Sequence, residues 1–452
     1  MSDLRLHGAA APGPGRFVLY WMQATMRAHH NAALDHAITV ADGLGVPILV
    51  YHGLRRDHAW ASARFHTFLL QGVVDLQREL ATRDIGYVFW LDRPGGPPSP
   101  LVTLASQAAL VVTDYAPAFV HPRQVAGLRK RVRTPVVAVD SAAIVPIRYH
   151  DRAHATARGI RTVLMAALAQ NLAPPADRSP KNRSRVDPGV EPVVVTEKGI
   201  PDLVAAAGVD PSVPPAAMTG GSTAGRARLK AFLEDGLPRY EAERSDPNAG
   251  AESRLSPWLH FGHLSPWDVV LPTRQHEKFL DEVLVWRELG LNFCSFDVNY
   301  DRYEATPPWA AAQLAAHEGD PRPALFDRAT LEEGRTGEPL WDAAMRFYRR
   351  DGWMHNALRM LWGKAVVQWT RTAPEAFALL VELNNRWALD GRDPSSWMNI
   401  HWVFGKFDRP FYRRPIYGTV RYMSLRTARD KFDVDAVVRA SRRAIVVWDE
   451  RS

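Results

Sequence analysis

Short apolar runs alternate with longer amphipathic stretches over the first third of the chain. Five runs rich in β-branched and aromatic residues are predicted to be strands, at 16–20, 46–51, 87–91, 110–113 and 136–139. Between them, stretches such as 30–43 and 65–83 carry apolar residues at steps of three and four, which predicts helices. This repeated strand–helix order predicts a parallel five-stranded sheet with helices on both faces, of Rossmann-like or flavodoxin-like type.

The pattern changes after residue 170. Residues 171–219 are rich in Pro, Ser and Asp, which predicts an interdomain linker. From 220 to 452 the apolar spacing is almost wholly helical, so an all-α domain is expected there. Its helices are predicted near 223–236, 266–273, 276–294, 338–350, 353–370, 373–389 and 423–444. The α/β domain is therefore assigned to 16–170, after a flexible tail over 1–15 that is rich in Gly, Ala and Pro.

Tryptophan and positive charge are both concentrated in the second half of the chain. Of 15 tryptophans, eleven fall between Trp258 and Trp402. The net charge is +7, and residues 401–452 contribute +6 of it, from twelve Lys/Arg against six Asp/Glu. Dense indoles are most often core packing, but they also suit an aromatic ligand, stacked bases or electron transfer. The basic end indicates either a solvated helical face or a surface for a polyanion.

The composition also excludes several classes of protein. The single cysteine, Cys294, excludes a disulfide framework and a cysteine-based metal site, and no metal is expected. The chain has no signal-peptide pattern and no apolar run of 18 residues, so we predict a cytoplasmic protein that acts as a monomer. The G-x-G-x-x-G fingerprint of dinucleotide-binding folds does not follow the first predicted strand.

Two segments of the helical half carry candidate chemistry. Ser256 and Ser265 each precede a proline, an arrangement that suits helix N-caps and, less commonly, a phosphate site. In the segment 279–293, Glu288 and Asn292 lie four residues apart on one side of an otherwise apolar helix. Such groups are costly to bury unless they are paired or face a cavity, and a structural ion pair is the alternative.

With these motifs the chain resembles the photolyase/cryptochrome flavoproteins, and in particular the class II cyclobutane pyrimidine dimer (CPD) photolyases. The resemblance covers nearly the whole chain. It rests on Leu-Ser-Pro-Trp-Leu-His-Phe-Gly at 255–262, Trp-Arg-Glu-Leu at 286–289, Tyr-Trp-Met-Gln at 20–23, Gly-Gly-Ser-Thr-Ala-Gly at 220–225, Leu-Asn-Asn-Arg-Trp-Ala-Leu-Asp-Gly-Arg-Asp-Pro at 383–394 and Arg-Tyr-Met at 421–423.

The resemblance implies a U-shaped FAD in the helical domain, reduced and anionic in the active state. Arg359 and Asp390 match an ion pair beside the flavin ring, and Asn384 matches the side chain that faces flavin N5. The residues that the resemblance assigns to cofactor binding are Tyr240, Leu255, Ser256, Arg287, Asn292, Arg359, Asn384 and Asp390. An antenna pigment such as 8-hydroxy-5-deazaflavin is implied for the N-terminal domain, although Arg27 and the pair His154-Ala155 lie in segments that depart from the usual pattern.

The resemblance also implies light-driven DNA repair, in which excited reduced FAD gives one electron to a pyrimidine dimer flipped out of the duplex. Glu288 matches the glutamate that hydrogen-bonds the dimer, Met360 the methionine against it, and Trp402 an aromatic wall. Trp362, Trp341 and Trp369 match the electron-transfer chain, in that order from the flavin; core packing is the alternative interpretation of the pair at 362 and 369. The residues expected to grip DNA near the lesion are Arg409, Phe411, Arg413, Arg414, Arg421, Arg429 and Lys431.

One departure lies in the predicted DNA-contacting region. The run 403–411 is one residue shorter than usual, and Phe411 stands where the family has tryptophan. Two other functions compete with repair: a cryptochrome-like photosensor, and a nucleic-acid binder without photochemistry. The chain ends shortly after its last predicted helix, which favours repair. His355 and His401 are weak candidates for the histidine pair of the six-four branch.

Overall fold

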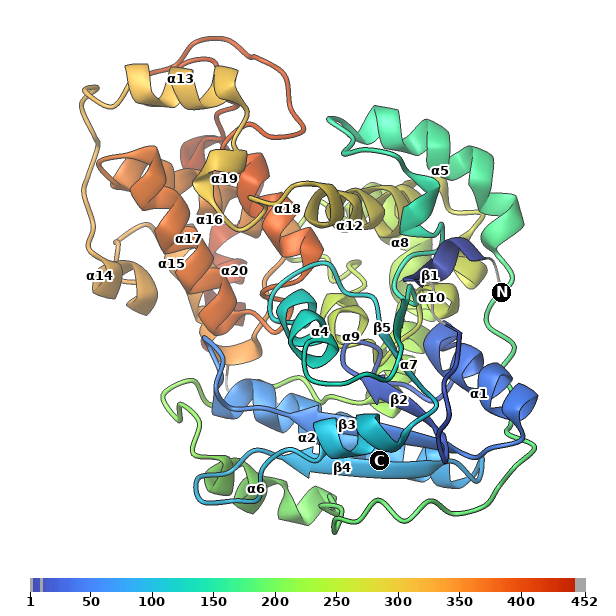
Figure 1. Cartoon of the computed structure of the whole chain (residues 1–452). Helices are drawn as coiled ribbons and strands as arrows, with labels where there is room; N and C mark the ends of the chain where they lie inside the picture. The colour runs from blue at the N-terminus through green and yellow to red at the C-terminus, as the bar shows by residue number, and fades with distance from the viewer. Residues whose placement is uncertain (1–2, 9–10, 444–452) are drawn as a thin grey trace.

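The computed structural model describes residues 3–8 and 11–443, beginning with an α/β domain (Figure 1). The sheet has six strands in the order β1-β6-β5-β2-β3-β4, and all neighbours are parallel except the antiparallel pair β1–β6. The strands are β1 (Leu6–His7), β2 (Val18–Met22), β3 (Ile48–Leu54), β4 (Gly86–Leu91), β5 (Leu110–Asp114) and β6 (Val136–Val139). The α/β class and all five predicted strands are thus confirmed, and the predicted strand number is one too low.

The sixth strand comes from the segment predicted to be a flexible tail. Residues Asp3–Arg5 form a short 3-10 helix, and Leu6 and His7 of β1 pair with Val139 and Ala138 of β6. The buried Arg5 guanidinium donates to the backbone carbonyls of Asp140, Ala143 and Ile144. These carbonyls follow the last strand and have no sheet partner of their own, so the N-terminal segment is held in place rather than loose.

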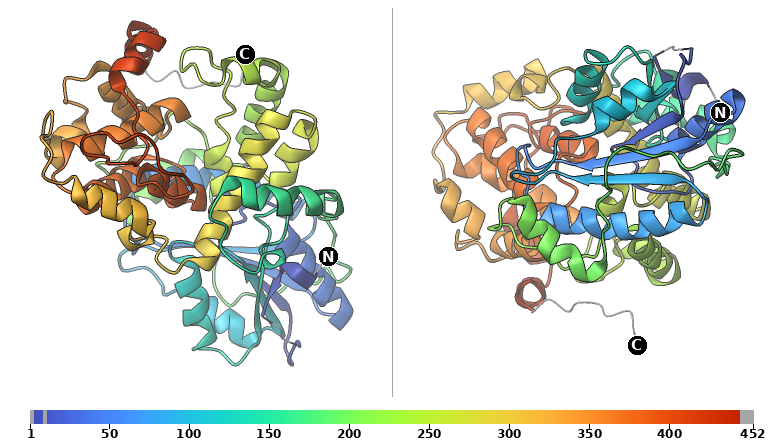
Figure 2. Two further views of the ribbon diagram at one scale, coloured as in Figure 1. Left: turned by 90° about the horizontal axis from the view of Figure 1, so that it is seen from above. Right: turned by 60° about the horizontal axis from the view of Figure 1, so that its bottom comes forward.

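Each face of the sheet is covered by its own helices, because alternate strand residues point to opposite faces. Val18 and Tyr20 pack on one face against α1 and α2, whereas Leu19 and Trp21 pack on the other against α3 and α4. The helices of this part are α1 (Ala32–Leu44), α2 (Ala63–Ala81), α3 (Leu101–Gln107), α4 (His121–Arg129) and α5 (Ala157–Asn171). Figure 2 shows α1 and α2 beside the strands, while α5 packs against the helical domain.

The predicted linker is not a bare connector. Residues Glu197–Gly199 form a 3-10 helix that leads into α6 (Ile200–Ala207). Ile200 and Ala207 of α6 are buried in the cluster that also contains Leu76 and Leu80 of α2. The linker therefore adds to the core of the α/β domain as well as crossing between domains.

The second half of the chain is helical, as predicted. Its first group is α7 (Ser222–Ala231), the π-helix η4 (Phe232–Gly236), α8 (Leu237–Glu243), α9 (Ser256–His260), α10 (Pro266–Thr273), α11 (Glu277–Leu280), the π-helix η5 (Asp281–Trp286) and α12 (Arg287–Phe296). The second group is α13 (Pro308–Ala316), α14 (Arg328–Glu333), α15 (Pro339–Asp351), α16 (Asn356–Trp369), α17 (Ala373–Trp387), α18 (Pro394–Val403), α19 (Leu425–Lys431) and α20 (Val434–Arg442). Within the described residues, no helix is long and apolar enough to cross a bilayer.

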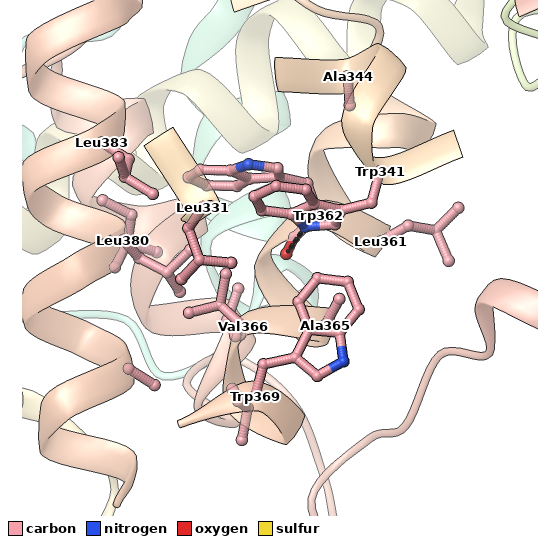
Figure 3. Packing of buried hydrophobic residues seen from close by; sticks show 14 of the residues in the cluster. Leu331, Trp341, Ala344, Leu361, Trp362, Ala365, Val366, Trp369, Leu380 and Leu383 are labelled. Carbon is pink, nitrogen blue, oxygen red and sulfur yellow. Dashed lines mark hydrogen bonds between the residues drawn. The ribbon is translucent and has the colours of Figure 1, made fainter. Parts of the chain in front are cut away.

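The two domains share packing. Phe65 and Phe68 at the start of α2 lie in one apolar cluster with Phe232 and Trp258 of the helical domain. A second cluster contains buried side chains of α15, α16 and α17, among them Trp341 and Trp362 (Figure 3). The helices that carry the predicted site residues are thus fixed by a buried core.

Candidate active site

One cavity brings together five of the residues singled out in the sequence. Arg359, Met360 and Trp362 reach it from α16, Asn384 from α17, and Trp402 from the end of α18. Its empty volume is about 410 Å³, including the open solvent at its mouth. Arg359 and Trp362 are three residues apart and share a face of α16, whereas Met360 lies about 100° further round the helix, so the cavity follows part of the circumference of α16.

Arg359 is held by three groups inside this site. Its Nη2 and Nη1 lie 2.5 and 3.1 Å from the two carboxylate oxygens of Asp390, and Nη2 also donates to Asn384 Oδ1 at 3.2 Å. Its Nε donates to the hydroxyl of Tyr348. Burial disfavours the Arg359 charge, but Asp390 and Tyr348 outweigh burial and raise the pKa of Arg359. The guanidinium therefore stays charged beside the cavity.

Asn384 is oriented by the same network. Its Oδ1 also accepts a hydrogen bond from the Tyr348 hydroxyl at 3.3 Å, and its Nδ2 donates to Asn385 Oδ1 at 3.1 Å. An amide nitrogen has two N–H groups, so one N–H of Asn384 is left for a partner in the cavity that it lines. Tyr348 was not predicted from the sequence, although it follows Trp341 and Met345 at helical spacing on α15.

The three tryptophans of the predicted electron-transfer chain are in contact (Figure 3). Trp341 stacks on Trp362 with ring centroids 6.4 Å apart and planes 12° from parallel. Trp369 meets Trp341 edge-on at 5.3 Å, so Trp341 of α15 bridges the two indoles of α16. The Trp362 ring also lines the cavity, and its Nε1 lies 3.1 Å from Met345 Sδ. The order Trp362–Trp341–Trp369 is therefore a continuous series of ring contacts that starts at the site.

The chain beyond Trp402 folds back beside the cavity. Arg421 lies over the rings of both Phe411 and Trp402, at 4.2 and 5.6 Å from their centroids. Its guanidinium pairs with Asp408 at 2.6 and 3.0 Å. Phe411 and Trp402 are thus linked by one cation, which gives a physical reason for an aromatic residue at 411 even where it is not tryptophan.

The basic residues predicted to contact DNA differ in whether they already form an ion pair with a carboxylate. Arg429 donates to Glu338 at the start of α15, at 3.0 Å, and Arg421 is paired as described. The others are exposed side chains with no ion pair among the described residues: Arg409, Arg413, Arg414 and Lys431. Tyr412, 92% exposed, lies between two of these arginines. The loop 409–414 is therefore the most open basic and aromatic segment near the cavity.

The structure does not bring Glu288 or Asn292 to this cavity. Glu288 is 1% exposed, and its carboxylate accepts hydrogen bonds from the backbone N–H groups of Ile144 and Val145. Asn292 is fully buried and bonds to the backbone of His154 and Arg152. This side of α12 packs on the loop that follows β6. The expected bond of Glu288 to a lesion and the expected contact of Asn292 with the cofactor therefore do not arise at this cavity, and both stay predictions.

Arg287 does not line this cavity either. Its Nη1 donates to the carbonyl of Ala142 at 2.6 Å, and it lines a different cavity described below. The remaining predicted cofactor residues lie in another cluster: Tyr240 packs edge-on against Phe279 at 5.1 Å, near the buried Leu255. Ser256 is the first residue of α9 rather than its N-cap, whereas Ser265 caps α10 with Asp268 in a capping box, as expected.

The stability of the protein is predicted to depend on pH through Glu288. Burial raises the pKa of Glu288 to about 8. An unfolded glutamate loses its proton near pH 4.3, so between about pH 4.3 and 8 the folded state binds more protons and the free energy of unfolding falls as pH rises. Glu288→Gln, which cannot titrate, is expected to flatten this slope in urea unfolding series at several pH values. An equal slope in both proteins would contradict the assignment.

A second cavity lies where α9 and α12 meet the carboxyl ends of the parallel strands. It has an empty volume of about 1310 Å³, including its open mouth. Its walls combine aromatic rings with cations, among them Trp21, Phe119, Arg55, Arg287 and Arg392. Burial lowers the pKa of Arg392 to about 9, and no carboxylate among the described residues is hydrogen-bonded to it. The chemistry of this cavity suits a flat ligand with negative charge.

Comparisons with known proteins agree with this architecture. A family model described as DNA photolyase matches residues 18–180, and one described as the FAD binding domain of DNA photolyase matches residues 279–436. A deoxyribodipyrimidine photo-lyase of Methanothermobacter thermautotrophicus is 34% identical over 438 residues, which are 96% of each chain. A protein of the same name from Potorous tridactylus is 32% identical over 92% of this chain and 79% of its own.

Solved structures show the same fold at lower identity. A class III photolyase of Agrobacterium tumefaciens superposes with a TM-score of 0.68 at 18% identity, over 96% of this chain and 88% of that one. A cryptochrome of Synechocystis gives 0.69 at 17% identity, over 95% and 89%. An α/β domain followed by a helical domain is thus the fold shared with photolyases and cryptochromes. At the level of sequence, the chain belongs to the DNA photolyase family, and its helical half contains that family's FAD-binding domain.

The residues around the first cavity fit a flavin. Arg359 supplies a charge that suits an anionic ring, and Asn384 keeps one N–H for a ring nitrogen or oxygen. Trp362 supplies apolar surface in the same cavity. The donor set and the apolar walls are those expected for a planar, partly anionic cofactor.

Proposed function

We propose that the protein repairs cyclobutane pyrimidine dimers in DNA by a light-driven reaction, as a class II type of photolyase. The observation that carries the proposal is the convergence of Arg359, Met360, Trp362, Asn384 and Trp402 on one cavity. The class II assignment is supported by the Leu-Asn-Asn-Arg-Trp-Ala-Leu-Asp-Gly-Arg-Asp-Pro block at 383–394, which supplies Asn384 and Asp390. FAD, when bound and reduced, would supply the single electron that splits the dimer.

In this mechanism the protein positions groups and excludes water. Arg359, fixed by Asp390 and Tyr348, would hold positive charge next to the cofactor, and Asn384 would offer it the N–H that is not bonded to Asn385. Met360 and Trp402 provide the surface on which a flipped pyrimidine pair would lie. Exposed arginines of the loop 409–414 would neutralise neighbouring phosphates, so DNA binding should weaken steeply with salt.

The lesion is proposed to be the cyclobutane dimer rather than the six-four product. His401 is fully buried, with Nε2 at 2.9 Å from the carbonyl of Tyr300, and His355 accepts a hydrogen bond from Ala357 N at the start of α16. Neither histidine lines the cavity that contains Met360 and Trp402. Proton transfer from a histidine pair to a lesion there is therefore not supported by their placement.

We also propose that the second cavity holds an antenna pigment of the deazaflavin type. Its aromatic and cationic walls lie at the carboxyl ends of β2, β3 and β5, where ligands of parallel sheets commonly bind. Arg27, which departs from the usual family pattern, also lines this cavity. An absorption band in addition to that of FAD, present after purification or after reconstitution, is the expected signature.

The test of the proposed function is a repair assay with photoreduced protein and DNA that contains a single cyclobutane dimer. Blue or near-UV light is expected to restore the dimer to two pyrimidines, with no conversion in the dark. Trp402→Ala is expected to weaken binding to damaged DNA by about 1–3 kcal/mol through loss of base stacking, with little change on undamaged duplex. Photoreduction without repair would favour the photosensor, and protein without bound flavin would favour a plain nucleic-acid binder.

A further inference from the structure

Trp402 differs from the other indoles of the site in having two cations over its ring. Lys364 Nζ lies 4.9 Å from the ring centroid and the Arg421 guanidinium 5.6 Å from it. In the described part of the chain, no cation lies over Trp341, Trp362 or Trp369. Trp402 and Trp362 nevertheless line the same cavity, so both are placed as electron donors to a group bound there.

Lys364 is the more unusual of the two cations. It is fully buried, donates to the carbonyl of Val403 at 2.6 Å, and forms no ion pair with any described residue. Arg421, in contrast, is neutralised by Asp408. Val403 is the last residue of α18, so the ammonium satisfies a carbonyl at a helix end that carries partial negative charge. Burial of an ammonium group without a carboxylate partner costs free energy. We therefore expect the charge to have a function.

Oxidation of an indole creates positive charge, and a nearby cation disfavours that charge most strongly where water is absent. Trp402 should therefore be harder to oxidise than Trp362. The Trp362 Nε1 instead lies 3.1 Å from the sulfur of Met345, whose lone pairs favour positive charge on the ring. The electrostatic surroundings thus separate two indoles that line one cavity.

We propose that Lys364 suppresses Trp402 as an electron donor and so directs oxidation into the series Trp362–Trp341–Trp369. The proposal rests on the proposed function, because it requires FAD in the cavity. On illumination of oxidised FAD, one electron passes from Trp362 to the flavin, Trp341 refills Trp362, and Trp369 refills Trp341. The flavin gains one electron and Trp369 loses one, which an added thiol reductant returns. Lys364 acts through Trp402 and is a positioning residue, not a catalytic one.

The experiment compares flavin photoreduction and tryptophan radical formation by flash absorption in the purified holoprotein at about pH 6, where Lys364 is charged. Trp362→Phe is expected to lower the yield of photoreduction at least about tenfold. Adding Lys364→Met to Trp362→Phe is expected to restore about tenfold, because Trp402 becomes oxidisable once the charge is gone. Lys364→Arg in the same background retains the charge and should leave the yield low. Adding Trp402→Phe to the restored protein should abolish the gain.

A merely structural role for Lys364 would not produce a gain that disappears with Trp402→Phe. Absence of the gain, or its persistence after Trp402→Phe, would overturn the proposal and point to another donor such as Tyr348. The flavin content and the thermal midpoint of each variant show whether it is folded. The wild-type repair assay decides the proposed function separately: wild-type protein that repairs dimers while the Lys364→Met gain is missing refutes only the inference.

A second measurement needs no substitution at Lys364. Burial lowers the pKa of Lys364 to about 7, so its charge is present below that pH and lost above it. The other groups that face it are Asp408, Arg421 and Tyr417, and burial raises the pKa of Tyr417. In Trp362→Phe protein the photoreduction yield should rise between about pH 6 and 8.5, and the rise should vanish with Trp402→Phe. A flat profile would contradict the proposal.

Discussion

Asp390→Asn is expected to lower the free energy of unfolding by about 3–5 kcal/mol and to reduce flavin retention at least about tenfold. The carboxylate makes both short contacts to Arg359, at 2.5 and 3.1 Å, and its side chain is only 5% exposed. Without it, Arg359 is left as a buried and uncompensated cation, and its links to Tyr348 and Asn384 lose their anchor. Chemical unfolding and the flavin content after gel filtration measure the two effects.

The matched control is Asp84→Asn, which breaks the ion pair of Asp84 with Arg183. That pair is 2.8 Å long, but its side chains are 56% and 61% exposed. Solvent screens such a pair, so the expected cost is below about 1 kcal/mol, and flavin retention should not change. If Asp390→Asn changes the free energy of unfolding and the flavin retention as little as this control, then the ion pair with Asp390 does not stabilise Arg359 in the site.

Much of the fold could be predicted because the periodicity is strong. The strands β3 and β5 begin with the apolar runs 48–51 and 110–112, and helices such as α16 and α17 have the spacing of apolar residues that packing requires. The strand β1 could not be found in this way. It has two residues, and its stability depends on pairing with β6 and on Arg5 binding carbonyls about 135 residues away in sequence. Contacts of that range leave no local pattern.

In the site, too, local sequence patterns predict some features, whereas contacts between distant segments determine others. Residues close together in one segment could be grouped from the sequence, since Arg359, Met360 and Trp362 all line one cavity, and the motif at 383–394 supplies Asn384 and Asp390 beside Arg359. The position of Glu288 could not be predicted. Helical spacing shows that Glu288 and Asn292 share a side of α12, but not whether that side faces a cavity or another domain. Here it faces residues 144–154.

The sequence alone does not indicate what surrounds the side chain of Lys364. A single lysine among the apolar residues of 358–369 is either snorkelling to solvent or buried with a partner. Only the structure shows that it ends between the Val403 carbonyl and the Trp402 ring. Tyr348 is similar, because its role arises from meeting two other helices at Arg359 and Asn384. Side chains that join three elements are the part of a site that sequence patterns describe least.

Arg64→Met is expected to cost about 3 kcal/mol of unfolding free energy, the largest effect of a residue outside the site. The Arg64 side chain extends from α2 of the α/β domain and donates to four backbone carbonyls, those of Pro214, Tyr348, Arg349 and Trp387. Tyr348 and Arg349 lie in the last turn of α15, and Trp387 is the last residue of α17, so the cation meets the negative end of each helix. The carbonyl of Tyr348 also accepts a hydrogen bond from the backbone N–H of Gly352, at 3.0 Å.

The expected change in the free energy of unfolding is the difference between two opposing contributions. Each buried carbonyl left without a donor costs about 1–3 kcal/mol, while burial of the cation is itself unfavourable and lowers the pKa of Arg64 to about 10. Arg78→Met on the same helix removes an arginine that is 60% exposed, and should change stability by less than about 1 kcal/mol. Because Arg64 also holds the carbonyl of Tyr348, whose hydroxyl bonds Asn384, loss of Arg64 should broaden the flavin absorption bands as well. Unfolding curves that are equal for the two variants would show that the domain contact is not anchored by Arg64.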